Sequence, residues 1–295
     1  MAWIMTLIGG SDTTGVLPDI AAAIARALDL RAEPDWLAPG AACDLSIDGI
    51  APEAADRAAR AAVGAAPIDI VVQPLDGRRK RVLVADLEST IIENEMLDEL
   101  ADFIGMRAPV AEITRRAMNG ELDFAAALAE RVALLRGLPV SVLDDAAKRI
   151  RMMPGARALV ATSRAAGIRT ALVSGGFAVF AEPVAASLGF DRVVANHLDI
   201  VGGRIAGTVR SPIVDRDAKR DALIALAAED GIPMTAILAV GDGANDLPML
   251  LAAGIGVAFR AKPAVAAAAR WRIEHADLTA LLYLQGYRAA EIASD

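Results

Sequence analysis

Carboxylates and hydroxyls follow a short apolar run in the first third of the chain. The run 82–85 stops at Asp86, and Glu88, Ser89 and Thr90 come directly after it. Apolar runs of this length are typical of interior strands in parallel sheets, whose carboxyl ends form the crevice that binds ligands. The same pattern alone also fits a strand that ends in a solvated turn. The functional interpretation therefore depends on what the rest of the chain supplies.

Two more predicted strands, 169–173 and 236–240, also end in polar residues. These residues are Ser174, Gly175 and Gly176 after the first strand, and Asp242, Asn245 and Asp246 after the second. The carboxyl ends of parallel strands meet at one edge of the sheet. We therefore expect all three groups to share one crevice, although each residue taken singly also fits a turn or a helix cap.

The combined residue types are suited to phosphoryl transfer. Converging carboxylates need a shared cation, and hard oxygen ligands beside a phosphate favour Mg²⁺. A hydroxyl at Ser174 and free backbone N–H groups suit a phosphate, and Lys219 adds a positive charge at the start of a predicted helix. Asp86 would then be the nucleophile that forms an aspartyl-phosphate. Glu88 would protonate the leaving oxygen and later deprotonate the attacking water.

The order of predicted elements indicates two domains. From residue 82 onward strands and helices alternate, which predicts a Rossmann-like parallel α/β sheet with right-handed crossovers and a hairpin over 199–209. Residues 93–153 contain only amphipathic helical patterns, which indicates a helical insertion. Residues 1–77 follow the order β-α-β-β-α-β of a small ferredoxin-like or ACT-like α+β module. We predict a core at 78–295 that carries the insertion, preceded by this N-terminal domain.

Composition narrows the functional classes. The net charge of −8 argues against nucleic acid and anionic membranes as partners, since both attract basic surfaces. The longest uncharged stretches, 170–181 and 247–259, are shorter than the roughly 20 residues of a membrane span. The N-terminus lacks a secretory signal pattern, and the single Cys43 excludes an internal disulfide. We expect a cytoplasmic protein with a small-molecule substrate, and a homodimer stays open.

The motifs at the strand ends resemble those of the haloacid dehalogenase (HAD)-like hydrolases, and within that superfamily those of the phosphoserine phosphatases. The matching runs are Asp86-Leu87-Glu88-Ser89-Thr90, Leu172-Val173-Ser174-Gly175-Gly176-Phe177, Lys219 and Gly241-Asp242-Gly243-Ala244-Asn245-Asp246. The resemblance covers about residues 82–285 and makes the helical insertion a cap. It implies a Mg²⁺-dependent hydrolase that converts O-phospho-L-serine to L-serine and phosphate, the last step of serine biosynthesis.

The resemblance also implies roles for single residues in the core. Mg²⁺ would be bound by the side chains of Asp86 and Asp242 and by the backbone carbonyl of Glu88. Asp246 would orient the metal site or the catalytic lysine from behind. The phosphate or substrate would be held by Ser174, the Gly175 backbone, Lys219 and Asn245.

In the cap, the resemblance assigns the substrate's ammonium and carboxylate to Glu95 on the first helix and Arg131 on the third. Met118 and Phe124 would supply apolar contacts. Without the resemblance, Glu95 and Arg131 are typical of solvated charges on amphipathic helices.

One residue departs from the family pattern, which has Asp where this chain has Glu88. The carboxyl group is kept, but the side chain is one methylene longer, and proton transfer depends on close reach. We expect an active enzyme because the other motif residues are present. Two alternatives stay open: a HAD phosphatase or phosphotransferase for another small phosphometabolite, and a catalytically weakened protein that senses an amino acid.

Overall fold

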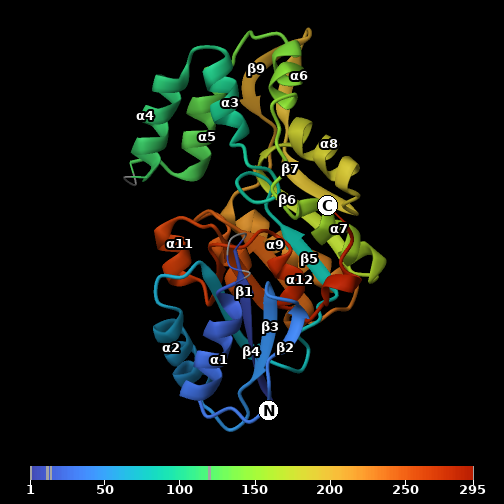
Figure 1. Ribbon diagram of the computed structural model, residues 1–295. Helices are drawn as coiled ribbons and strands as arrows, with labels where there is room; N and C mark the ends of the chain where they lie inside the picture. The colour runs from blue at the N-terminus through green and yellow to red at the C-terminus, as the bar shows by residue number, and fades with distance from the viewer. Residues whose placement is uncertain (1, 11–12, 14, 119–120, 295) are drawn as a thin grey trace.

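A six-stranded parallel sheet forms the centre of the molecule (Figure 1). The computed structural model describes every residue except 1, 11, 12, 14, 119, 120 and 295. The sheet order is β12-β11-β10-β5-β6-β7. Its strands are β5 (Val82–Ala85), β6 (Arg169–Phe177), β7 (Arg192–Asn196), β10 (Ile237–Gly241), β11 (Ile255–Phe259) and β12 (Trp271–Ile273). The run that precedes Asp86 is thus an interior strand with neighbours on both sides.

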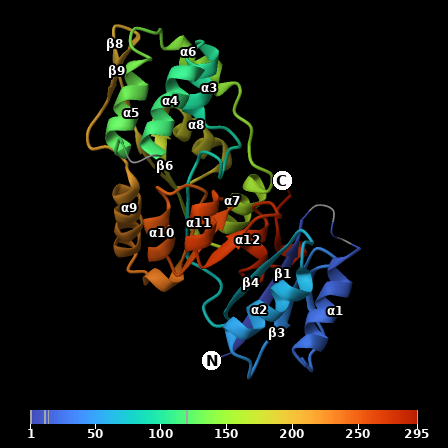
Figure 2. The same cartoon turned by 90° about the vertical axis from the view of Figure 1, so that its left-hand side faces the viewer.

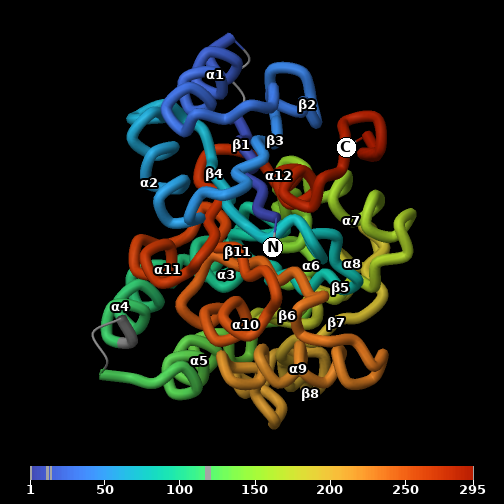
Figure 3. Tube along the Cα trace, turned by 90° about the horizontal axis from the view of Figure 1, so that it is seen from below, coloured from blue at the N-terminus to red at the C-terminus, as the bar shows by residue number. Residues whose placement is uncertain are grey.

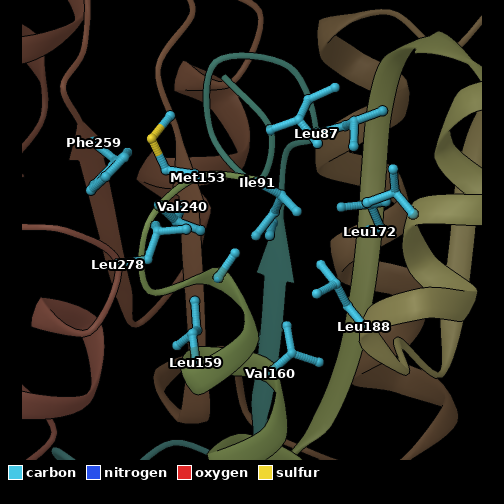
Figure 4. Packing of buried hydrophobic residues seen from close by; sticks show 14 of the residues in the cluster. Leu87, Ile91, Met153, Leu159, Val160, Leu172, Leu188, Val240, Phe259 and Leu278 are labelled. Atoms are coloured by element: carbon cyan, nitrogen blue, oxygen red, sulfur yellow. The ribbon is translucent and has the colours of Figure 1, made fainter. Parts of the chain in front are cut away.

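Helices cover both faces of this sheet because side chains alternate along its strands. In β5, Leu83 packs with α7, α8 and α12 on one face, while Val84 packs with α9, α10 and α11 on the other. Figure 4 shows part of the first of these two cores. These helices are α7 (Ala156–Ala165), α8 (Ala178–Leu188), α9 (Arg216–Glu229), α10 (Leu247–Ala252), α11 (Pro263–Ala268) and α12 (Ala280–Tyr283), with short 3-10 turns η1 (Met234–Ala236) and η2 (Ala289–Glu291). The Rossmann-like core is confirmed.

A cap of helices stands at one end of the core (Figures 1 and 2). Its helices are α3 (Met96–Phe103), α4 (Arg107–Met118), α5 (Phe124–Ala133) and α6 (Ser141–Ala147). The hairpin β8 (Leu198–Val201) and β9 (Arg204–Val209) packs against α5. The Gly137 N–H donates to the Ile205 carbonyl at 2.8 Å, and the Ile205 N–H donates to Leu138 at 2.9 Å. The cap is therefore built from two separate segments, of which the sequence analysis had placed only the first there.

The N-terminal domain lies at the opposite end of the core from the cap (Figures 1 and 2). Its antiparallel sheet has the order β2-β3-β1-β4. The elements are β1 (Trp3–Gly9), α1 (Leu17–Ala27), β2 (Asp35–Ala38), β3 (Ala42–Ser46), α2 (Pro52–Val63) and β4 (Ile68–Pro74). Element order and sheet order match the expected ferredoxin-like arrangement.

Both faces of the N-terminal sheet are covered. Met5 and Leu7 pack with α1 and α2 on one face, whereas Ile8 belongs to the large core cluster that also contains Leu282 of α12. Figure 3 shows α12 beside β1 and β3. The hydrophobic core thus continues from the central sheet into the N-terminal domain.

Polar contacts reinforce this contact between the domains. The Asp69 carboxylate on β4 accepts backbone N–H bonds from Glu274, His275 and Ala276 at 2.7, 3.1 and 2.8 Å. Within the basic cluster 78–81, which joins the two domains, Arg78 pairs with the buried Asp44 at 2.6 Å. This part of the basic cluster therefore contributes to domain packing.

The boundaries of several predicted elements differ from the observed ones. Strand β6 continues to Phe177, past the predicted end at residue 173, and the sequence analysis did not predict α11 or β12. None of the described helices combines the length and the apolar character needed to cross a membrane.

Candidate active site

Asp86, Lys219 and Asp246 form a buried charged group at the carboxyl edge of the sheet. The Lys219 ammonium lies 2.6 Å from Asp86 Oδ1 and 2.6 Å from Asp246 Oδ1, and its side chain is 0% exposed. Strand β5 positions Asp86, and the first turn of α9 positions Lys219. Burial lowers the pKa of Lys219, but Asp246 and Asp86 raise it more, so the net shift is upward. Lys219 is therefore a fixed positive charge beside the candidate nucleophile.

The acidic group carries more negative charge than Lys219 alone balances. Asp86, Asp242 and Asp246 are all buried and offer oxygen atoms within 4.8 Å of one another. Burial and the neighbouring Asp246 raise the pKa of Asp86 to about 8 and that of Asp242 to about 6. These raised pKa values reflect burial and the repulsion among three carboxylates that Lys219 alone does not offset. The oxygen-only donor set fits a divalent cation, whose charge would favour the ionised carboxylates.

The Gly241–Asp246 loop depends on glycine at its first position. A Cβ atom at Gly241 would lie 2.5 Å from the Asp246 carboxyl carbon. Asp246 Oδ2 in turn accepts the N–H of Gly243 at 2.9 Å. Asp246 thus contacts both the loop and Lys219.

Ser174, Gly175 and Gly176 form a bulge within β6, next to the acidic group. The Ser174 hydroxyl oxygen accepts the Gly176 N–H at 2.9 Å. A Cβ atom at Gly175 would lie 3.2 Å from the Phe124 ring and 3.7 Å from the Asn245 amide nitrogen. The absence of a side chain at Gly175 leaves its backbone open to the cavity, with Asn245 beside it.

The longer carboxylate of Glu88 fits between the core and the first cap helix. Its Oε1 accepts the backbone N–H of Met96 at 2.8 Å. A Cβ atom at Gly176 would come within 2.8 Å of Glu88 Oε2, so the glycine provides the space for this side chain. Burial, followed by the charge of Glu95, raises the pKa of Glu88 to about 8. A carboxyl group that is protonated near neutral pH is suited to donate a proton.

A cavity of about 670 Å³ lies between the core and the cap. From the core it is lined by Asp86, Glu88, Gly175, Asp242 and Asn245, and from the cap by Glu95, Phe124 and Arg131. The structure thus brings these predicted residues together around one space. Ser174, Lys219 and Asp246 are buried and are not part of the described lining.

Two cap residues carry the charges expected for an amino-acid substrate. Glu95 is the N-cap residue of α3, one position before the helix, and accepts a hydrogen bond from the Ser89 hydroxyl at 2.7 Å. Arg131 on α5 donates to the Ala127 carbonyl at 3.2 Å. Burial lowers the pKa of Arg131, and the charges of Asp98, Glu88 and Glu95 act in the opposite direction. The side chain of Met118 lies outside the described residues.

The sequence analysis missed charged residues that also line this cavity. Lys262 has its ammonium 3.9 Å from Asp242 Oδ2, and Arg216 stands at the start of α9. Lys262 follows β11, so the same rule about strand ends could have found it. Asp98, one helical turn after Glu95, carried no such signal.

The fold and the site define a hydrolase class with a parallel α/β core, a helical cap and an acidic site between them. Residues 83–251 match the haloacid dehalogenase-like hydrolase family, and the chain belongs to this family.

Known proteins resemble the chain over different lengths. The chain is 46% identical over 227 residues to a phosphoserine phosphatase, SerB2, of Mycobacterium tuberculosis. This match spans 76% of the present chain but only 56% of the length of that relative. The crystal structure of a HAD family hydrolase from Salmonella enterica serovar Typhi superposes with a TM-score of 0.85 at 30% identity, covering 97% of this chain and 98% of the other. The structure of a phospho-aspartyl intermediate analogue of phosphoserine phosphatase superposes with a TM-score of 0.65 at 36% identity. It covers 70% of this chain and 98% of the other.

Proposed function

We propose that this protein is a Mg²⁺-dependent phosphatase that hydrolyses O-phospho-L-serine to L-serine and phosphate. The observation that carries the proposal is the buried Asp86, held 2.6 Å from Lys219 within an acidic group at the base of a capped cavity. The names of the Mycobacterium relative and of the phospho-aspartyl structure support the same substrate. The proposal places the reaction at the last step of serine biosynthesis.

In the first proposed step, an Asp86 carboxylate oxygen attacks phosphorus and the bond from phosphorus to the serine oxygen breaks. Glu88 gives its proton to that oxygen, so serine leaves as an alcohol and Asp86 carries the phosphoryl group. In the second step, Glu88 takes a proton from water while the water oxygen attacks phosphorus, which releases phosphate and restores Asp86. Asp86, Asp242 and the Glu88 carbonyl would hold Mg²⁺, which supplies charge neutralisation for the phosphoryl oxygens.

The remaining core residues would hold the phosphoryl group during both steps. Lys219 contributes its charge, and the Gly175 backbone and Asn245 contribute hydrogen-bond donors. Ser174, in the same bulge of β6, would add its hydroxyl group as a further contact to the phosphoryl group. Asp246 keeps Lys219 in place through its 2.6 Å contact.

The cap would select the substrate by its amino-acid end. Glu95 would bind the ammonium and Arg131 the carboxylate, with Phe124, together with Met118, as the apolar contact. These charges line the same cavity as Asp86. A phosphate ester without an amino-acid end would leave both of them unpaired, which disfavours it.

A substrate panel tests this assignment. Phosphate release from L-phosphoserine should exceed release from glycerol phosphate and from sugar phosphates by at least about a hundredfold in kcat/KM. Arg131→Ala should remove most of that preference, while Arg136→Ala, an arginine on the same cap outside the described cavity lining, should keep it. A native enzyme that prefers a sugar phosphate would favour the alternative, a HAD phosphatase or phosphotransferase for another metabolite.

A further inference from the structure

The side chain of Asn196 connects two segments of the candidate phosphate site. Asn196 ends β7 and is 1% exposed. Its Nδ2 donates to the Gly175 carbonyl at 2.8 Å and to the Val214 carbonyl at 3.3 Å, and its Oδ1 accepts the Val214 N–H at 2.8 Å. Both amide hydrogens and the amide oxygen are therefore used in buried contacts.

Gly175 needs such a partner because β6 leaves its regular pairing with β7 at this point. The ladder pairs Val173 with Val194 and next Phe177 with Asn196, so 174–176 form a bulge. A bulge leaves backbone groups without ladder partners, and a buried carbonyl without a partner is costly. The Asn196 amide replaces the missing partner and fixes the bulge.

Val214, the second segment, leads directly into the helix that carries Lys219. Asp215 caps α9 by accepting the N–H groups of Asp217 and Ala218 at 3.0 and 2.9 Å. The Lys219 N–H donates to the Asp215 carbonyl at 3.0 Å. The two hydrogen bonds between Asn196 and Val214 therefore hold the chain one residue before this cap and determine where the helix begins.

We infer that Asn196 is a positioning residue for phosphate binding, which holds the Gly175 backbone and Lys219 at a fixed separation around the phosphoryl group. This inference rests on the proposed function, because it takes these two groups as phosphate ligands. Asn196 acts from behind them, since it is absent from the described lining of the cavity. Among the described residues, the Asn196 side chain hydrogen-bonds to Gly175 and Val214 and to none of Asp86, Asp242 and Asp246, so we expect its loss to change metal binding much less than phosphate binding.

The test compares Asn196→Ala with a matched variant of the same two strands. Asp191, the residue before β7, accepts the N–H and the hydroxyl of Thr170 in β6 with its Oδ2 at 2.8 and 3.0 Å, near the other ends of these two strands. Asp191→Ala should lower Tm without changing phosphate binding. Asn196→Ala should raise the dissociation constant of inorganic phosphate and the KM for L-phosphoserine about tenfold to a hundredfold, the order expected for displacements near 1 Å. Half-saturation by Mg²⁺ should stay within about twofold of wild type.

A second variant tests the direction of the hydrogen bonds. Asn196→Asp keeps an acceptor for the Val214 N–H but places an oxygen against two carbonyls, so it should weaken phosphate binding as much as Asn196→Ala. Unchanged phosphate affinity in both variants would overturn the inference. An equal loss in Asp191→Ala would also overturn it, because a general loss of stability would then explain the effect.

The native protein offers a measurement that needs no variant. Saturating inorganic phosphate should slow amide exchange of the Val214 N–H at least about tenfold, because ligand binding stabilises the segments it joins. No change in that rate overturns the inference. A wild type that binds phosphate but hydrolyses no phosphoserine contradicts only the proposed function, whereas one that binds no phosphate contradicts both.

Discussion

Glu88 is the residue where the chain leaves its family pattern, and its surroundings explain how the longer side chain fits. Its carboxylate accepts the Met96 N–H at 2.8 Å and lies against Gly176, which has no side chain to displace it. The group thus touches both the core and the cap.

Two substitutions of Glu88 distinguish the effect of losing its carboxyl proton from the effect of changing the length of its side chain. Glu88→Gln keeps the length and a hydrogen-bond acceptor but has no carboxyl proton, so kcat should fall about a hundredfold or more. Glu88→Asp keeps the carboxyl group and should retain activity within about tenfold. The measurement is steady-state phosphate release at saturating L-phosphoserine. If Glu88→Gln were as fast as the native enzyme, the acid/base role would be wrong.

Single residues of the site differed in how well the sequence identified them. Asp86, Asp242 and Lys219 stood next to predicted strand or helix ends, and the structure places them around one acidic site. Asn196 and Lys262 also stand at or just after strand ends, but polar residues there are common, and only contacts across the sheet give them a role. The catalytic and binding roles of all these site residues stay predictions.

At the scale of elements, the local sequence pattern predicts that the hairpin β8–β9 forms, but it does not predict where the hairpin packs in the fold. The Gly202-Gly203 turn predicted a hairpin, and one is present. Its place against α5 and the 137–140 segment depends on contacts across about 65 residues of chain, which no local periodicity reveals. The same holds for β12, a strand of only three residues at the edge of the sheet.

Matched substitutions in the hairpin test its packing on the cap. Ile205 is 1% exposed within the core cluster, while Ile200 on the partner strand is 44% exposed. Ile205→Ala should lower the free energy of unfolding by about 2–4 kcal/mol, and Ile200→Ala by less than about 0.5 kcal/mol. Denaturant unfolding measures both. Equal effects would contradict the assignment of the hairpin to the cap.

At the scale of the whole molecule, the N-terminal domain shares a hydrophobic core with the catalytic part. The sequence predicted the order of its elements from local periodicity. It gave no indication that the open face of the sheet meets α12, because that contact joins the two ends of the chain. The division at residue 77 stays a prediction, and the shared core predicts that both parts unfold together.

The Asp69 contact tests this coupling. Asp69→Asn offers one acceptor oxygen in place of two, so at least one buried N–H in 274–276 loses its partner. The free energy of unfolding should fall by about 1–3 kcal/mol. Asp56→Asn breaks only a surface pair with Arg60 on the same domain and should cost under about 1 kcal/mol. A cost for Asp69→Asn no larger than this control would show that the contact does not hold the domains together.

The central claim is that Asp86 is the nucleophile of a metal-dependent phosphatase. The most direct measurement is phosphate release from L-phosphoserine by protein freed of metal with a chelator, with and without added Mg²⁺, for wild type, Asp86→Asn and the surface control Asp48→Asn. The account predicts activity in wild type and Asp48→Asn only when Mg²⁺ is present, and a loss of at least about a thousandfold in Asp86→Asn. Mg²⁺-independent release, or an Asp86→Asn enzyme as active as the control, would contradict it.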